Sequence, residues 1–216
     1  MNAQLFLEQF SYIINTPKGI QQLRKIIYQL AITGALTTQL HTDGDSRELL
    51  VEIENLKKRL IQKKAYKRLI KLESETLHTP PNFPIPDSWE WTRLLDIGEI
   101  NPKNNAVEER PASFIPMSGI PENYMGPLIT KEESWGEIKK SFTHFKNGDV
   151  VLAKITPCFE NGKAAVIENL DHVIGAGSTE LYVFRPIHPN ISSKYIYLLL
   201  KSPFFVYESK KNMTGE

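Results

Sequence analysis

The stretches GDVVLAKITPCFENGKAAV, residues 148–166, and GAGSTELYVFR, residues 175–185, decide the fold of this chain. Residues 150–155 and 164–167 are short apolar runs, rich in β-branched side chains and bounded by turn residues, which predicts two buried strands. Residues 181–184 form a third run of this kind. The two stretches therefore predict strands joined by polar connections, one before residue 164 and one before residue 181.

The first of these connections carries strong turn signals. Asn161-Gly162 favours a tight turn because glycine adopts positive φ without steric cost and asparagine tolerates it well. Thr156 precedes a proline and is therefore expected to be extended. We expect an exposed loop displaying the polar side chains of Lys154, Thr156, Glu160, Asn161 and Lys163.

The second connection, residues 175–180, consists mostly of small and hydroxyl-bearing residues. Such residues permit the close approach of another backbone or of a phosphate. Composition and spacing alone indicate only an exposed polar loop on a mixed α/β domain.

The same stretch resembles a known protein family. Residues 148–165, with Gly-Ser-Thr-Glu at 177–180 and Phe-Arg-Pro at 184–186, resemble the target-recognition domain of the DNA specificity subunit of type I restriction-modification systems. The resemblance extends upstream to PDSWEW at residues 86–91 and to residues 23–34, and so covers most of the chain. It implies an α+β protein in which a helical region precedes a mixed α/β target-recognition domain.

The N-terminal part has helical periodicity. Apolar spacing predicts helices at about residues 3–14 and 19–34, the second ended by Gly34, and we expect both faces of the second to be buried. A third, longer helix at about residues 46–72 should begin with a capping box formed by Asp45 and Glu48. Four apolar residues of this helix have the spacing of a short coiled-coil seam: Leu49, Ile53, Leu56 and Leu60.

The long helix also carries a run of cations without an acidic residue between residues 57 and 71. Three interpretations remain open: a solvated face, a face that contacts DNA phosphates, and a docking surface for another protein. The resemblance implies that this helix is a spacer that engages methyltransferase subunits. The cations assigned to docking or phosphate contact are Lys57, Lys58, Lys63, Lys64, Lys67 and Arg68.

The proline-rich segment TPPNFPIP, residues 79–86, predicts a semi-rigid linker. We divide the chain into a helical spacer and docking region at residues 1–75, a linker at 76–88 and the target-recognition domain at 89–216. Trp89 and Trp91 are expected to pack at the start of that domain rather than stack on a base. The resemblance further implies that the sequence stops short of a second recognition repeat.

Within residues 89–216, the pattern is clear at some positions and ambiguous at others. Residues 93–100 fit a strand or a short helix, residues 101–110 a polar loop, and residues 114–117 a strand. We expect residues 121–146 to be a variable excursion that contributes to sequence reading. The last element should be a helix at residues 191–207, capped by Ser192 or Ser193 and kinked or split at Pro203.

The charge is unevenly distributed along the chain. Residues 1–73 carry 12 Lys and Arg against 7 Asp and Glu, whereas residues 74–216 carry 14 against 18. A DNA-binding surface in the second part must therefore use a local cluster of cations. A single cysteine and the lack of a Cys/His array argue against a disulfide and a structural zinc site. No apolar run approaches the roughly 20 residues of a membrane span, so we expect a cytoplasmic protein.

The sequence contains no phosphate-binding loop, dinucleotide fingerprint, metal-binding carboxylate motif or glycine-rich S-adenosylmethionine site. Cys158 with His144 or His172 could form a thiolate–imidazole pair, so a cysteine hydrolase is a remote alternative. We expect His144 to be a surface residue without a role. The chain is thus predicted to be non-catalytic and without cofactors, and the resemblance implies that partner subunits hold S-adenosylmethionine, ATP and Mg.

The resemblance implies a sequence-specific DNA-binding subunit that reads one half of a bipartite target. The resemblance implies double-stranded DNA, methyltransferase subunits and a restriction subunit as partners, and the coiled-coil seam would allow two copies to associate. The alternative is a protein-interaction scaffold, which the net acidity of residues 74–216 favours. Six residues are predicted to contact DNA, each also able to serve only the fold: Lys154, Thr156, Asn161, Lys163, Ser178 and Thr179.

Overall fold

The computed structural model describes residue 10, residues 15–16, residues 18–63 and residues 81–212. Apart from Phe10, the helix predicted at residues 3–14 lies outside the described residues, as does the second part of the long basic helix. The described residues form helices and two four-stranded sheets, which confirms the predicted α+β class.

The first sheet is antiparallel and has the strand order β1-β8-β5-β6. The three strands predicted from the β-branched runs are its centre and one edge, and Val150 of β5 lies between Val166 and Phe184 of its two neighbours. The bounds of the four strands are β1 (Gly98–Ile100), β8 (Leu181–Pro186), β5 (Val150–Ala153) and β6 (Ala164–Val166).

The second sheet has the order β3-β2-β7-β4 and is mixed, because β2 and β7 run parallel. Its bounds are β3 (Lys131–Ser134), β2 (Pro111–Ile115), β7 (Ile174–Gly177) and β4 (Thr143–Lys146). The segment expected to be a variable excursion, residues 121–146, therefore supplies two of the four strands, while its variability and its part in sequence reading stay predictions. Between β3 and β4, the short helix α5 (Trp135–Ile138) buries Trp135 against Ala112 and Ala176, so this segment belongs to the core.

The two faces of the first sheet contact different partners, as the alternation of side chains along a strand requires. Val151 and Val183 point toward the second sheet and share a cluster with Ile115 and Phe145. Val150, Leu152 and Phe184 point the other way, into a cluster with helical residues. The first sheet is thus the central layer of the fold.

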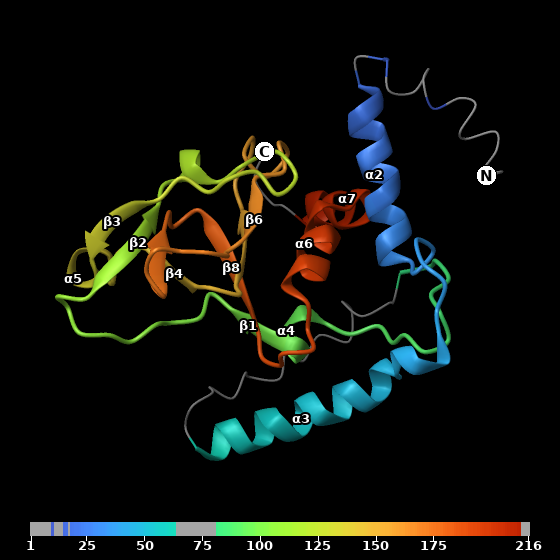
Figure 1. Cartoon of the computed structure of the whole chain (residues 1–216), viewed down its shortest axis with the longest axis horizontal. Coiled ribbons are helices and arrows are strands. Elements are labelled where there is room, and N and C mark those ends of the chain that lie inside the picture. Colours follow the sequence, from blue (N-terminus) through green and yellow to red (C-terminus); the bar gives the residue numbers. More distant parts are fainter. Residues whose placement is uncertain (1–9, 11–14, 17, 64–80, 213–216) are drawn as a thin grey trace.

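The helical layer on that face is formed by α6 (Ser193–Lys201) and α7 (Pro203–Asn212). Ser192 caps α6 by accepting a hydrogen bond from the Tyr195 N–H at 3.3 Å. The predicted split at Pro203 is confirmed. Figure 1 shows α6 and α7 between the sheets and α2 (Gly19–Ile32), which packs on both.

Only one face of α2 is covered by the described residues. Tyr28 and Ile32 are buried, whereas four large apolar side chains are exposed: Ile20, Ile26, Ile27 and Leu30. The expectation that both faces are buried was therefore wrong for the part of the chain that the structure describes. Gly34 follows the helix with φ +71°, as predicted for a residue just beyond a C-terminus.

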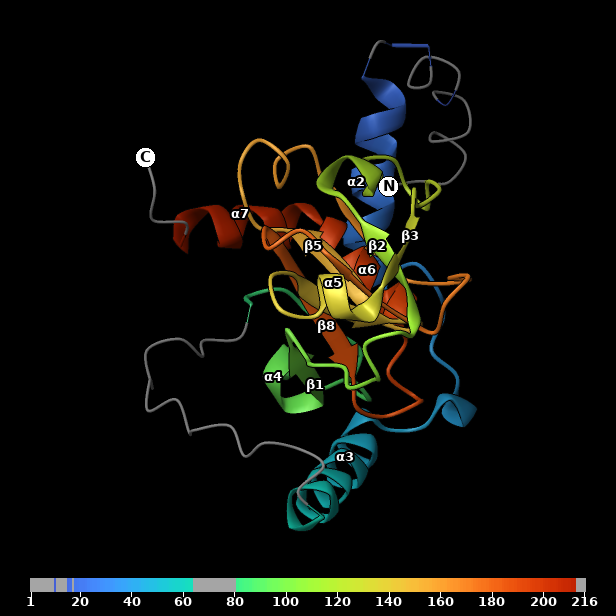
Figure 2. The same cartoon turned by 90° about the vertical axis from the view of Figure 1, so that its left-hand side faces the viewer.

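The long helix α3 (Ser46–Gln62) lies at the opposite end of the molecule from α2 in Figure 1 and Figure 2. Asp45 caps the helix by accepting a hydrogen bond from the Arg47 N–H at 2.8 Å. In the predicted capping box the donor would be the N–H of the next residue, Glu48. Ile53 of the predicted coiled-coil seam is buried in the core beside Ile97, and Leu49 packs against the same cluster. The seam is thus used in part for packing within the chain, and a coiled coil with a second chain stays a prediction.

The remaining short elements join these layers. They are the 3-10 helices η1 (His41–Asp43) and η3 (Met117–Gly119) and the single turn α4 (Leu94–Ile97), which runs directly into β1. Trp89 packs edge-on against Tyr195 at 5.8 Å between ring centroids, and its Nε1 donates to Gln39 Oε1 at 3.0 Å. The predicted packing of Trp89 is therefore confirmed. No helix within the described ranges has both the length and the apolar character of a membrane span.

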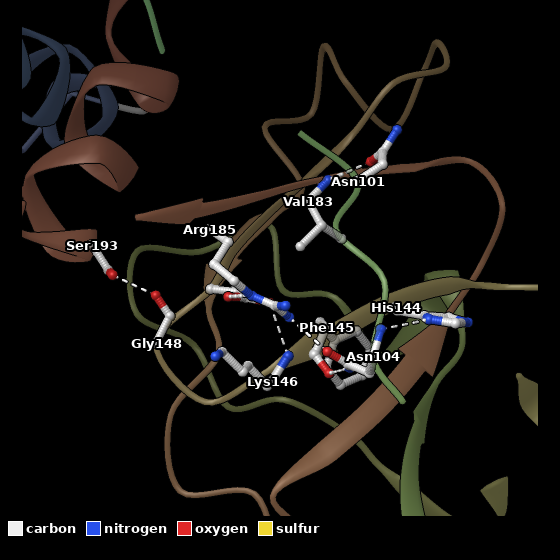
Figure 3. A network of polar contacts seen from close by, with 10 residues as sticks. Asn101, Asn104, His144, Phe145, Lys146, Gly148, Val183, Arg185 and Ser193 are labelled. Carbon is white, nitrogen blue, oxygen red and sulfur yellow. Dashed lines mark hydrogen bonds and ion pairs between the residues drawn. The ribbon is translucent and has the colours of Figure 1, made fainter. Parts of the chain in front are cut away.

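A buried polar network joins the two sheets to the polar loop before β2 (Figure 3). Asp149 is fully buried and accepts two hydrogen bonds from Arg185, which also contacts Asn104. The Asn104 N–H donates to His144 Nδ1 at 3.0 Å, and His144 Nε2 lies 2.7 Å from the Lys139 carbonyl. His144 is therefore a buried residue, contrary to the expectation of a surface position, because its ring fills the core beside Trp135 while both nitrogens find backbone partners.

Candidate nucleic-acid interface

The loop of residues 154–163 and the short connection of residues 178–180 lie side by side at one end of the first sheet. The earlier part of the predicted second connection, residues 175–177, is instead a buried part of β7. The backbone N–H of Lys154, just after β5, donates to the Glu180 carbonyl at 2.9 Å, just before β8. The Ala153 N–H donates to the Lys163 carbonyl at 2.9 Å and closes the loop between β5 and β6. Residues that are far apart in sequence, such as Thr156 and Thr179, therefore occupy adjoining loops.

The loop of residues 154–163 is compact. The Phe159 N–H donates to the Ile155 carbonyl and the Asn161 N–H to the Pro157 carbonyl, at 2.8 and 2.9 Å. Phe159 is buried in the core and anchors the loop from below. Gly162 has φ +71°, which confirms the turn predicted at Asn161-Gly162.

Two of the predicted contact residues are engaged within the chain. Lys163 Nζ donates to the Met117 carbonyl at 3.2 Å, and Asn161 Nδ2 donates to Glu122 Oε1 at 3.3 Å. Both contacts join the loop to residues 117–122. The geometry thus gives these two side chains a role in fixing the loop.

The other four predicted residues differ in exposure. Thr156 and Thr179 are exposed, whereas Ser178 is partly buried and its Oγ accepts from the Glu180 N–H at 3.2 Å. Lys154 Nζ lies 5.7 Å from the centroid of the Tyr182 ring. Lys154 is partly buried, and an ammonium group over an aromatic ring can still donate to a phosphate or a base edge.

Tyr182 was missed by sequence reasoning. It is 48% exposed although it lies in β8 between the buried residues Leu181 and Val183. An exposed aromatic ring beside a lysine supplies a surface on which a base can stack. The alternation of residues 181–184 could have indicated an outward position for Tyr182, but not its proximity to Lys154.

Two lysines of the C-terminal helices, also missed, hold the loop from the helical side. Lys210 of α7 pairs with Glu160 at 2.6 Å. Lys201 at the end of α6 donates to the carbonyls of Gly162 and Glu122, at 2.6 and 2.7 Å. Burial, and to a lesser extent the nearby Arg24, lowers the pKa of Lys201 to about 8, and Glu122 opposes this shift.

The predicted basic face of α3 divides in the structure. Lys57 Nζ donates to the carbonyls of Leu95 and Asp96 at 3.0 and 3.1 Å, so this cation fastens α3 to α4. Lys58 is exposed and pairs with Glu54 at 2.7 Å, and Lys63 is exposed at the helix end. The other three cations of the predicted set, Lys64, Lys67 and Arg68, lie outside the described residues.

The thiolate–imidazole alternative finds no support in the geometry. Both ring nitrogens of His144 are engaged by the backbone of Asn104 and Lys139, and His172 Nε2 contacts Glu132 at 2.8 Å. Cys158 is partly buried and packs against the core between the sheets. Among the described residues, no group of three or more His, Cys, Asp or Glu side chains is arranged to hold a metal ion.

Two curated proteins of Escherichia coli are similar to this chain. The type I restriction enzyme EcoAI specificity subunit is 42% identical over 198 residues, which cover 91% of this chain and 33% of the relative. The EcoEI specificity subunit is 39% identical over 201 residues, with the same coverage of 91% and 33%. The chain is related to type I restriction enzyme specificity subunits. The resemblance predicted from the sequence is therefore confirmed.

The identity with the specificity subunits spans both the helical part and the two sheets, because it extends over nine-tenths of the chain. The chain spans about one third of the length of these specificity subunits. No family model matches the chain. Among solved structures, the HsdS subunit from Thermoanaerobacter tengcongensis gives a TM-score of 0.47 at 19% identity, covering 62% of this chain and 35% of that chain.

Proposed function

We propose that this chain is a DNA-recognition part of a type I restriction-modification complex, which reads one half of a bipartite target. The observation that carries the proposal is the 42% identity over 91% of the chain with a protein named as a specificity subunit. The chain supplies binding, while methylation and cleavage belong to partner subunits that hold S-adenosylmethionine, ATP and Mg. Such a complex works on DNA in the cytoplasm.

The DNA-contacting surface in this proposal comprises the two adjoining loops before β6 and β8. The exposed Thr156 and Thr179 and the partly buried Lys154 supply donors and acceptors, and Tyr182 supplies a ring. Ser178, Asn161 and Lys163 complete the predicted set, the last two acting mainly by holding the loop. A well-placed contact to a base edge discriminates against a wrong base by about 1–3 kcal/mol.

The helical region, residues 1–75, would dock the methyltransferase and restriction subunits, with residues 76–88 as the linker to the target-recognition domain at 89–216. The exposed apolar side chains of α2 and the exposed cations Lys58 and Lys63 of α3 support a docking role. Lys64, Lys67 and Arg68 extend the same basic run, and Lys57 would serve it indirectly by holding α3 on α4. The proposal includes association of two copies through the helical region.

A second candidate, a protein-interaction scaffold that does not read bases, is favoured by the exposed apolar face of α2. The two functions predict different results when DNA duplexes are selected for binding. The full chain is assembled with its cognate methyltransferase subunits and used to select bound fragments from a pool of random duplexes. The proposed function predicts enrichment of a short, fixed motif.

The control for this selection is a pair of variants of the same chain. Replacing Lys154, Thr156 and Thr179 together by alanine should abolish the enriched motif while the complex still assembles. Lys131→Ala, which removes an exposed lysine from β3 of the other sheet, should leave the motif unchanged. A complex that assembles but enriches no motif in the wild type would establish the scaffold instead.

A further inference from the structure

Lys201 joins two loop segments that are 40 residues apart in the sequence. It is the last residue of α6, and its ammonium group donates to the Gly162 carbonyl at 2.6 Å and to the Glu122 carbonyl at 2.7 Å. Both distances are those of charge-assisted hydrogen bonds. One side chain from the helical layer therefore holds the end of the candidate recognition loop and the segment before β3.

The surroundings of the ammonium group give this contact an unfavourable contribution to the free energy of folding. Its Nζ lies 5.7 Å from the Tyr197 ring centroid, and the charged groups that face it are Arg24 of α2 and Glu122. Burying a lysine head and fixing its long side chain both oppose folding. The two hydrogen bonds to backbone carbonyls offset this cost. They hold in place the two segments to which the carbonyls belong.

Other contacts join the same two segments. Asn161 Nδ2 contacts Glu122 Oε1, and Lys163 Nζ contacts the Met117 carbonyl. Tyr197, one helical turn before Lys201, accepts a hydrogen bond from the Met125 N–H at 3.2 Å and lies 5.6 Å from Tyr124. Helix α6 is therefore the common support of the loop before β6 and of residues 122–125.

We propose that Lys201 is a positioning residue for DNA recognition, which fixes the loop of residues 154–163 so that Lys154 and Thr156 face the target in one geometry. This inference rests on the proposed function. In this proposal Lys201 holds the loop and does not contact DNA, since two of its three N–H donors are directed to the Glu122 and Gly162 carbonyls within the chain. Its loss should therefore reduce discrimination between target and altered sequences without removing a phosphate contact.

The test uses Lys201→Met in the full chain assembled with its methyltransferase subunits, because methionine keeps an unbranched side chain and removes both hydrogen bonds. Affinity is measured for the selected target duplex and for a duplex with one base pair changed, each over a range of salt concentrations. We expect the affinity ratio of the two duplexes to fall about tenfold, within the range of one lost base contact. The salt slope should equal that of the wild type, because each lost phosphate contact would change it by about 0.9.

Lys194→Met is the matched control, since Lys194 lies on the same helix but is exposed and faces Glu168. It should leave the affinity ratio unchanged. In parallel, the exchange of the Gly162 and Lys163 amide hydrogens, which donate to the carbonyls of Phe159 and Cys158, should accelerate only in Lys201→Met. This readout requires no DNA.

The outcomes separate the two proposals. If the wild type shows no preference for any duplex, the proposed function is overturned. If the wild type discriminates between the duplexes and Lys201→Met discriminates equally well, only the role of Lys201 is overturned. If Lys201→Met does not fold, Gly162→Ala tests the contact from the loop side. Its Cβ would lie 3.2 Å from Lys201 Nζ at a φ of +71°, so we expect the same loss of discrimination, and an unchanged ratio contradicts the inference.

Discussion

Asp149 and Arg185 form a bidentate ion pair in the interior of the protein, with Arg185 Nε 2.9 Å from Oδ1 and Nη2 2.8 Å from Oδ2. Asp149 also accepts from the Lys146 N–H at 2.9 Å, and Arg185 Nη2 donates to Asn104 Oδ1 at 2.9 Å. Burial raises the pKa of the Asp149 carboxyl, and the paired Arg185 opposes that shift. The pair therefore connects β8, the turn before β5 and the polar loop before β2 at one buried point.

Removing one partner of this pair should strongly destabilise the fold. Arg185→Met leaves the fully buried carboxyl of Asp149 without its cation, and breaking a buried pair in this way costs about 3–5 kcal/mol. Urea unfolding of the two proteins measures the difference. Arg93→Met is the matched control, because Arg93 and Asp96 form an exposed pair, for which about 0–1 kcal/mol is expected. Equal losses of unfolding free energy in the two variants would show that the buried Asp149 pair contributes no more to stability than the exposed pair.

His144 should make the stability of the protein depend on pH. Burial lowers its pKa below the ordinary value of 6.5, and the hydrogen bond to the Lys139 carbonyl only partly opposes this. Between the lowered pKa and 6.5, the unfolded chain binds more protons than the folded one. The stability that the neutral, buried imidazole of His144 contributes is therefore present above pH 6.5 and is lost as the pH falls through the lowered pKa.

The measurement is the free energy of unfolding of wild type and His144→Asn across that range. Asparagine does not titrate, so the advantage of the wild type at neutral pH should shrink as the pH falls below 6.5. A difference that stays constant at all these pH values would mean that the imidazole of His144 keeps an ordinary affinity for protons.

Lys57 should stabilise the position of α3. Its ammonium group donates to the carbonyls of Leu95 and Asp96 at the end of α4, where a cation is favoured by the helix dipole. We expect Lys57→Ala to lower the free energy of unfolding by about 1–2 kcal/mol and to accelerate amide exchange in α3. The neighbouring variant Lys58→Ala removes only an exposed pair with Glu54, and should change stability by less than about 0.5 kcal/mol. A Lys57→Ala variant no less stable than Lys58→Ala would contradict the anchoring role.

The elements that follow from local pattern could be predicted from the sequence, and those that depend on distant partners could not. Strands β5, β6 and β8 of the first sheet follow from their β-branched runs, whereas β1 was ambiguous between strand and helix. The turn at Gly162 and the split at Pro203 follow from backbone chemistry alone. The burial of His144 depends on Trp135 and on the Asn104 backbone, which no local window contains. For the same reason, residues 121–146 were not recognised as strands, because β4 pairs with β7 some 30 residues later.

The candidate site shows the same limit. The six predicted residues were chosen for their donors and their place in polar loops, and the structure does bring the two loops together through the contact between Lys154 and Glu180. The sequence could not indicate that Lys163 and Asn161 form hydrogen bonds to residues 117–122. Nor could it indicate that Lys201 supports the loop from α6, because that contact spans 39 residues.

Lys154 should contribute to DNA affinity by contacting a phosphate, which gives it a signature distinct from that of Lys201. Its ammonium group lies over the Tyr182 ring and carries no hydrogen bond to the loop segments that Lys163 and Lys201 hold. Each phosphate neutralised by a lysine releases counterions and adds about 0.9 to the magnitude of the salt slope. Lys154→Ala should therefore weaken binding to target and altered duplexes alike and reduce the slope by that amount, whereas Lys131→Ala on the other sheet should change neither. If Lys154→Ala instead lowered only the preference for the target, its amine would be reading a base edge; if it changed nothing, the loop before β6 would not face DNA.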